Sequence, residues 1–566
     1  RAFSGAQTRS IIGVSATPGT GDELVIVNTW SNTGEIYVRV AGRAGAYTTD
    51  GQFSINVAKD GMSCAALTDT ILTARTAATA GGFKTVILTD SSKVALDAAL
   101  DGGGTLRGRL AAFAARTEVA GVIVDVGLDG RVNDLKAQAA ANAACPFATN
   151  LVAEEIKGIV DSYRPGSPDL KYVVIAGNDA AIPFFRYPDQ SLLGQESGYV
   201  PPVKSDSASE ASLRTDHVLS QDAYGSGTRV SLRTSGFPVP GLAVGRLTET
   251  PAEMAGLIDA YTTAGGVVAP TSSLVTGYDF LEDAANAVKT ELAAGTGAAV
   301  DTLITPNGVS PQGPNPESDD PLPWTADDLA NKLLGSRHDV IFLAGHFSAN
   351  SALAADFTTS LITTDLAAST TSFTNSIVFS AGCHSGYNLV DTDAIEGVTL
   401  KLDWAQAFAQ KQATLIAGTG YQYGDTDFLE YSERLYANFA RQLRTGAGAV
   451  SVGEALVRAK LDYLATTPDI RGIHEKALLE ATLFGLPMLA VNMPGSRDGS
   501  PVPGGAVTPV AATWPGNASA ALTSLGLMTA ELTVAPTLTP KSLLLKSVEP
   551  PQTTAEITAD WWEGPQ

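Results

Sequence analysis

The chain has few cysteines, few basic residues and no long apolar run. Its three cysteines, Cys64, Cys145 and Cys383, permit at most one internal disulfide and leave at least one thiol free. This count excludes a disulfide-rich scaffold and a four-cysteine zinc site. No apolar stretch reaches the roughly 18 to 20 residues that a membrane-spanning helix requires, so we expect no transmembrane segment.

The charge balance is strongly acidic. The sequence has 59 acidic and 37 basic residues, a net charge of -22 at pH 7. Such a field repels phosphate backbones and anionic membranes, so nucleic-acid binding is not expected, whereas basic peptides or calcium suit it. The chain is 44% hydrophobic and only 17% charged, which is typical of packed globular domains. Because 566 residues exceed what one hydrophobic core usually holds, we expect two to four folded units.

The pattern of apolar runs divides the chain into four expected units. Short β-type runs broken by turn residues begin the chain, and similar runs return in a Pro-, Gly- and Thr-rich tail. Between them, continuous apolar runs alternate with helical stretches, which is typical of a mostly parallel sheet covered by helices. We therefore predict an α/β protein with flanking β-sandwich modules: a partial β-sandwich module over 1–61, α/β subdomains over 62–265 and 266–494, and a β-rich module over 495–566.

Two apolar strand patterns lead directly to a histidine and a cysteine. Residues 339–345 precede His346, and residues 376–382 precede Cys383. Ligands of open α/β sheets bind at the carboxyl ends of the strands, so we expect both side chains on one edge of the sheet. A thiolate is a strong nucleophile, and a neighbouring imidazole can remove its proton. The sequence therefore predicts Cys383 as a nucleophile and His346 as its base.

Each of these residues has a more ordinary interpretation when it is taken alone. A buried cysteine is usually a small apolar residue, and a histidine at a strand end is usually structural. The catalytic interpretation is favoured because the histidine and the cysteine occur together, each after an apolar strand pattern and each beside a glycine. The amide N–H groups of Gly345 and Cys383 are expected to form an oxyanion hole. His384 follows the cysteine directly, but consecutive side chains on an extended segment point in opposite directions, so the base role goes to His346.

The same segments resemble the histidine and cysteine motifs of the gingipain-type cysteine peptidases. Ala344-Gly345-His346 followed by Ser348, and Ala381-Gly382-Cys383 followed by Gly386, carry this resemblance. Further similar segments come in the family's order and extend the likeness to residues 80–492: 173–184, 216–224, 242–253 and 483–487. The chain departs from the family at Phe347, where the histidine motif often has glycine, and at Leu486, which replaces an aspartate.

The resemblance implies a caspase-like fold, in which residues 266–494 form the catalytic subdomain and residues 495–566 an immunoglobulin-like module. It also implies an acidic residue upstream of the histidine that orients the imidazole. Asp279, Glu282 and Asp283 are the candidates, and we favour Glu282 or Asp283. The alternative is that these carboxylates merely begin a solvated helix, since acidic side chains suit a helix N-terminus.

A substrate pocket is expected in the segment after the strand that follows the cysteine. The resemblance implies that this strand lines the pocket, and Tyr421 and Tyr423 follow it here. Asp425 or Asp427 would pair with a basic side chain between these rings, so we expect arginine or lysine at P1. Alternatively, the two carboxylates cap a helix that begins near Phe428 or hold calcium as a structural ion. No other metal site is expected, because His217, His338 and His474 lack ligand spacing.

The resulting hypothesis is a cysteine endopeptidase that hydrolyses protein or peptide substrates through a thioester acyl-enzyme and requires no cofactor. The flanking β modules and the acidic composition favour a secreted protein or one associated with a cell surface. The alternative is a silent or latent protein of the same fold that serves as a structural or binding component of the cell surface, since fold does not dictate function.

Overall fold

A computed structural model describes residues 80–231, 236–308, 322–425 and 428–499 without interruption, and several shorter pieces outside them. The shorter pieces are Cys64, residues 67–70, Leu72, residues 75–78, and the strands β1 (Ala2–Ser4), β2 (Ser10–Gly13), β3 (Ile36–Val38), β23 (Val510–Trp514), β24 (Ala518–Leu522) and β25 (Met528–Thr529). Most of the expected β modules at 1–61 and 495–566 lie outside the described residues.

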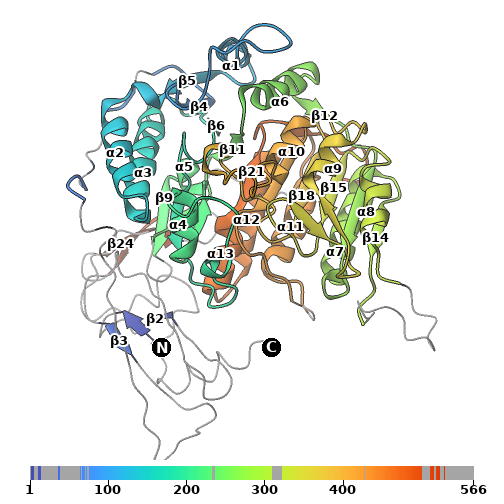
Figure 1. The fold of residues 1–566 in the computed structure, drawn as a ribbon. Helices are drawn as coiled ribbons and strands as arrows, with labels where there is room; N and C mark the ends of the chain where they lie inside the picture. Colours follow the sequence, from blue (N-terminus) through green and yellow to red (C-terminus); the bar gives the residue numbers. More distant parts are fainter. Residues whose placement is uncertain are drawn as a thin grey trace, which may run out of the picture.

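A ten-stranded sheet runs through the described chain (Figure 1). Its strands lie in the order β14 (Asp301–Ile304), β13 (Ser273–Gly277), β15 (Val340–Leu343), β18 (Ile377–Ser380), β19 (Thr414–Gly418), β21 (Ala481–Phe484), β11 (Ala243–Leu247), β6 (Tyr172–Ala176), β4 (Thr85–Thr89) and β5 (Gly121–Asp125). All neighbours are parallel except β19 and β21, where Ile416 lies opposite Leu483 in an antiparallel pair. The predicted α/β class with a mostly parallel sheet is therefore confirmed.

The single antiparallel pair divides the sheet into two parallel halves that run in opposite directions. The carboxyl ends of β13, β15, β18 and β19 therefore lie on one edge, and those of β4, β6 and β11 lie on the other. β21 belongs by sequence to the expected second subdomain but also pairs with β11 of the first, with Arg246 opposite Phe484. One continuous sheet thus connects the two halves.

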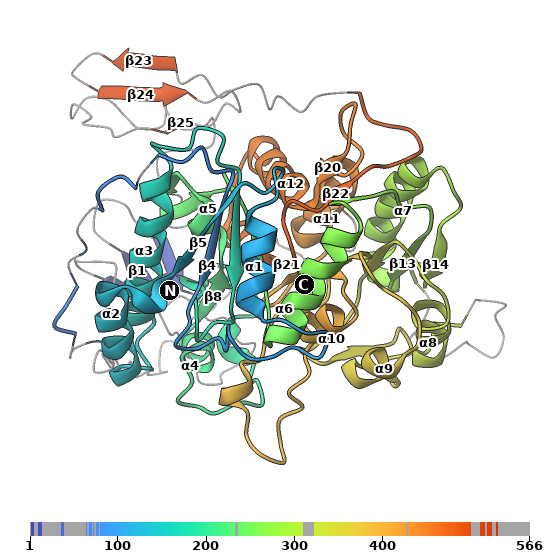
Figure 2. The same cartoon turned by 90° about the horizontal axis from the view of Figure 1, so that it is seen from above.

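Helices cover both faces of the sheet, which explains why most of its strands are continuous apolar runs. Helices α6 (Pro251–Thr263) and α10 (Trp404–Gln410) pack together on one side, whereas α7 (Glu282–Thr296), α11 (Tyr431–Gln442) and α12 (Val452–Thr466) gather on the other (Figure 2). The four phenylalanines and valines of β15 and β18 illustrate the result, since Val340, Phe342, Val378 and Phe379 have no exposed surface.

The remaining helices and strands connect these layers or extend from them. The helices are α1 (Leu106–Ala114), α2 (Gly130–Ala141), α3 (Pro146–Tyr163), α4 (Ala208–Arg214), α5 (Asp222–Gly225), α8 (Ala326–Leu333), α9 (Thr363–Ala368) and α13 (Gly472–Glu480), with short 3₁₀ turns η3 (Val126–Leu128), η4 (Glu196–Gly198), η5 (Asp279–Leu281) and η6 (Asp391–Asp393). The short strands are β7 (Phe185–Pro188), β8 (His217–Ser220), β9 (Thr228–Ser231), β10 (Gly236–Val239), β12 (Val267–Val268), β16 (Ser351–Leu353), β17 (Ser360–Ile362), β20 (Val450–Ser451) and β22 (Ala490–Val491).

The cysteines separate into one bonded pair and one free thiol. Cys64 and Cys145 form a disulfide, and Cys145 also begins α3. Cys383 is free. Among the helices of the described residues, we find no membrane-spanning candidate.

Candidate active site

His346 and Cys383 occupy matching positions after two neighbouring strands. β15 and β18 pair in parallel, and Leu343 lies opposite Ser380 at the end of their register. His346 and Cys383 each follow this last pair by three residues, so both leave the same edge of the sheet. Neighbouring strands lie about 4.8 Å apart. The topology therefore puts the segments that carry these two residues side by side at one edge of the sheet.

The segments around these two residues also touch. The Phe347 ring covers Gly382 so closely that a Cβ added at Gly382 would overlap it. The same ring lies 5.7 Å from the ring of Trp404, measured between centroids. Phe347 therefore fills the space that a glycine at this position would leave open beside the cysteine turn.

The His346 imidazole lies on the rim among three aromatic rings. Its centroid is 5.3 Å from that of Tyr278, 5.5 Å from that of Phe280 and 5.3 Å from that of Phe357, although the residue as a whole is exposed. This apolar surrounding lowers the pKa of His346, and the charge of Asp279 partly opposes the shift. The imidazole is therefore neutral at pH 7 and is able to accept a proton.

The three acidic candidates have different partners. The Glu282 carboxylate accepts a hydrogen bond from the backbone N–H of Asn307, at 2.7 Å, and Asp283 accepts one from an amide of its own helix. Asp279 is the carboxylate whose charge acts on His346. The three candidates line an open cleft of about 240 Å³, together with Phe280, Asn286 and Asn307. The electrostatics thus favour Asp279 over Glu282 and Asp283 as the partner of the histidine.

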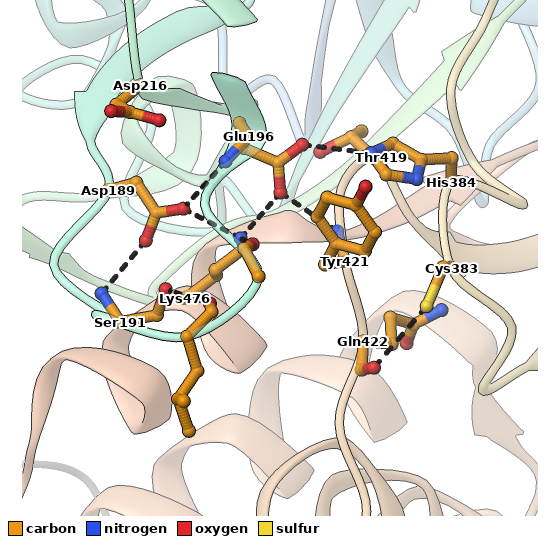
Figure 3. Close-up of polar contacts among 12 residues, drawn as sticks. Asp189, Ser191, Glu196, Asp216, Cys383, His384, Thr419, Tyr421, Gln422 and Lys476 are labelled. Carbon is orange, nitrogen blue, oxygen red and sulfur yellow. Dashed lines mark hydrogen bonds and ion pairs between the residues drawn. The ribbon is translucent and has the colours of Figure 1, made fainter. Parts of the chain in front are cut away.

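The Cys383 thiol is half-buried and hydrogen-bonded to the segment that follows β19. Its Sγ donates to the backbone oxygen of Gln422 at 3.5 Å (Figure 3). The side-chain amide of Gln422 in turn donates to the carbonyl oxygens of Ser380 and Gly382, at 2.9 and 2.7 Å. Burial raises the pKa of the Cys383 thiol to about 11, so the resting group is a neutral thiol at pH 7.

The expected oxyanion donors are available. Among the described residues, neither the Gly345 N–H nor the Cys383 N–H is paired in a hydrogen bond. Gly345 has φ of +151°, and a Cβ there would come within 2.5 Å of the Tyr278 ring, so this position requires glycine.

His384 is held away from the thiol. Its Nε2 lies 2.9 Å from Oε2 of Glu196, and its ring stacks on Tyr199 with centroids 3.5 Å apart. Figure 3 shows the imidazole directed toward Glu196 and the sulfur of Cys383 directed toward Gln422. His384 has a left-handed φ of +54°, a conformation that costs a residue other than glycine about 1–2 kcal/mol. The surrounding contacts must therefore hold this turn.

The tyrosines of the expected substrate pocket contact a lysine of the chain itself. The ammonium of Lys476 lies 5.4 Å from the centroid of the Tyr421 ring and 5.5 Å from that of Tyr423. Asp425 accepts a hydrogen bond from the backbone N–H of Phe428, at 3.1 Å, and so caps the turn that precedes α11. Asp427 lies outside the described residues. A P1 preference for arginine or lysine stays a prediction.

Residues that the sequence did not point to surround the cysteine turn. Gln422, Glu196, Asp189 and Lys476 are all buried there. Glu196 and His384 are 188 residues apart in the chain, so no local pattern relates them. Within the described part of the chain, no group of three or more histidine, cysteine or acidic side chains is arranged to hold a metal ion.

Comparisons with known proteins gave similarity only at the level of structure. No protein-family model and no curated protein matches the chain. One similar solved structure is the complex of the pro- and mature domains of RgpB from Porphyromonas gingivalis, with 14% identity, a TM-score of 0.44, and coverage of 72% of this chain and 80% of that chain. Another is described as a protease, with 8% identity, a TM-score of 0.40, and coverage of 80% and 91%.

Proposed function

We propose that this chain is a cysteine endopeptidase with a caspase-like arrangement, in which Cys383 is the nucleophile and His346 the general base. The observation that carries the proposal is the register of β15 and β18, which places the two residues at matching positions on one edge of the sheet. A free thiol, a neutral imidazole and two unpaired amide N–H groups at that edge are the groups that acyl transfer requires.

The protonation states suggest how the reaction proceeds. With a pKa of about 11, roughly one Cys383 thiol in ten thousand is ionised at pH 7. The proton therefore moves from Sγ to His346 while the sulfur bonds to the substrate carbonyl carbon, as in general-base catalysis. The amides of Gly345 and Cys383 stabilise the resulting oxyanion, and Asp279 stabilises the imidazolium.

The second half of the reaction uses the same groups. His346 returns its proton to the leaving amine as the C–N bond breaks, which leaves a thioester on Cys383. Water then attacks the thioester, His346 takes the proton of that water, and the thiol is restored as the acid product departs. This chemistry requires no cofactor, and calcium would serve only as a structural ion.

The substrates in this proposal are proteins or peptides outside the cell. A net charge of -22 attracts basic segments, which agrees with arginine or lysine at P1. The same acidic composition supports a secreted or cell-surface location.

A second candidate function is a latent or silent form of the same fold, which would act at the cell surface as a structural or binding component. One observation favours it: the Cys383 thiol is bonded to Gln422 and its pKa is raised, whereas catalytic cysteines usually have lowered pKa values. Rearrangement of the Gln422 segment would convert such a form into an active one.

Labelling with a substrate-like electrophile distinguishes the active peptidase from the silent form. The chain is incubated with peptidyl acyloxymethyl ketones that carry arginine, lysine or an uncharged residue at P1, and the intact mass is followed alongside iodoacetamide labelling at pH 6. The peptidase proposal expects labelling of Cys383 by at least one ketone, faster than by iodoacetamide and lost in His346→Ala. Equal rates in the wild type and His346→Ala for every reagent would instead support the silent form.

A further inference from the structure

One buried carboxylate joins the two segments that surround Cys383. Oε2 of Glu196 lies 2.9 Å from Nε2 of His384, which belongs to the turn after the nucleophile. Oε1 of Glu196 accepts the backbone N–H of Tyr421, at 2.9 Å, in the segment that also carries Gln422 (Figure 3). The carboxylate therefore connects both walls of the nucleophile site, although Glu196 itself lies in η4, which comes between β6 and β11 of the other half of the sheet in the sequence.

Lys476 of α13 supplies the opposite charge. Its ammonium lies 2.6 Å from Glu196 and 2.7 Å from Asp189, and it donates to the carbonyl oxygen of Gly194 at 2.8 Å. Burial by itself would raise the pKa of Glu196, but Lys476 and His384 lower it to about 2. The carboxylate is thus ionised although it has no exposed surface.

The cost of burying these groups indicates a role beyond stability. Buried ion pairs can often be replaced by well-packed apolar residues without loss of stability, and what they add in some proteins is a defined geometry. Here the geometry includes the left-handed backbone of His384, directly after the nucleophile. Strained backbone held by its surroundings is common at functional sites.

We propose that Glu196 is a positioning residue for Cys383: through His384 and the Tyr421 N–H it holds the nucleophile turn against the Gln422 segment, with Lys476 as its counter-ion. This inference rests on the proposed peptidase function. It assigns no contact with substrate to Glu196. Its removal therefore affects the orientation of Sγ and of the Cys383 N–H during acyl transfer more than it affects substrate binding, to which Glu196 contributes only through the backbone of Tyr421.

Two substitutions and their combination test this arrangement. Glu196→Gln keeps the shape of the side chain and removes its charge, and His384→Phe keeps a ring against Tyr199 and removes the bond to Glu196. Asp179→Asn is the control, because Asp179 is also a buried carboxylate paired with a cation, Arg186, but its hydrogen bonds go to Arg186, Ser209 and the Phe184 N–H and none of them to the cysteine turn. Each variant is assayed for kcat, for KM, and for the rate of Cys383 alkylation by iodoacetamide between pH 7 and 11.

We expect Glu196→Gln and His384→Phe each to lower kcat at least tenfold, with a smaller change in KM. The double variant should be no slower than the slower single variant, since the two residues act as one unit. Asp179→Asn should lower thermal stability but leave kcat within twofold. An unchanged kcat in folded Glu196→Gln, or equal losses in kcat for the control, would overturn the proposal.

Alkylation separates this inference from the proposed function. If the wild type turns over no substrate, the peptidase proposal fails. The pH profile of Cys383 alkylation then tests the positioning role of Glu196 without an activity assay. A change of at least threefold in the alkylation rate of Cys383 in Glu196→Gln, relative to the wild type, supports the positioning role. Alkylation rates identical to those of the wild type contradict it. If Glu196→Gln does not fold, the wild type is labelled with ¹⁵N-histidine and its His384 resonances are compared before and after Cys383 alkylation. The resonances should shift, because His384 and Cys383 belong to the same turn. Unchanged resonances would refute the connection between Cys383 and the His384–Glu196 contact.

Discussion

The Sγ of Cys383 donates to the backbone oxygen of Gln422 at 3.5 Å, while the side-chain amide of the same Gln422 donates to the carbonyl of Gly382 at 2.7 Å. One residue thus anchors both Cys383 and the turn that carries it. The thiol is held in its neutral form by burial. In the proposed mechanism, the neutral imidazole of His346 takes the thiol proton only when a substrate binds or this segment rearranges.

The alkylation rate of Cys383 should follow the titration of a thiol with a raised pKa. Because burial raises its pKa to about 11, the rate with iodoacetamide should keep increasing above pH 9, where an ordinary thiol is already mostly ionised. Rates measured by intact mass between pH 6 and 11 test this. A plateau reached by pH 8 would contradict the raised pKa.

Asp279→Asn should lower the pKa of His346 further, because it removes a negative charge that favours the imidazolium. We expect the acidic limb of the kcat/KM profile to move to lower pH and kcat to fall roughly 10- to 100-fold, the range of a weakened general base. Glu282→Gln is the control, since Glu282 is bonded to Asn307 instead, and it should change kcat less than twofold. Equal effects of the two substitutions on kcat would show that Asp279 has no special role toward His346.

Phe347→Ala should open the rim next to Cys383. The ring covers Gly382 and contacts Trp404, so its loss should cost about 3 kcal/mol of unfolding free energy, the low end for a phenylalanine that is only partly buried. Bulky maleimides should then react with Cys383 faster than in the wild type, while small reagents react at similar rates. An unchanged ratio between bulky and small reagents would show that Phe347 does not restrict access.

Glu433 should make the protein less stable as the pH rises. Burial raises the pKa of its carboxyl to about 8, with Asp283 and Asp425 adding repulsion. In the unfolded chain the pKa is about 4.3, so between pH 4 and pH 8 the folded state binds more protons and the free energy of unfolding falls with increasing pH. Glu433→Gln should therefore raise Tm relative to the wild type at pH 8 more than at pH 5, as measured by calorimetry. A Tm difference that is the same at both pH values would contradict this.

Much of the fold and part of the site were predictable because their signals are local. Apolar runs indicated the strands before His346 and Cys383, and the alternation of such runs with helical segments indicated the α/β class. The acidic residue whose charge acts on His346 was harder to predict, since Asp279, Glu282 and Asp283 are near neighbours in the chain. Only their individual hydrogen bonds and the position of His346 separate them.

The sequence by itself indicated the two apolar strands that lead to His346 and Cys383, and which of the three cysteines is a candidate nucleophile, because a run of apolar residues is a property of a few adjacent positions. The strands themselves end earlier than the sequence indicated, at Leu343 and Ser380. The tertiary structure alone decided that β15 and β18 are neighbours, that β19 and β21 join the two halves antiparallel, and that Glu196 meets His384. Such contacts join residues that are far apart in the chain, 188 positions for Glu196 and His384. They depend on the order of strands in the sheet and on the packing of buried charges, which no local pattern records.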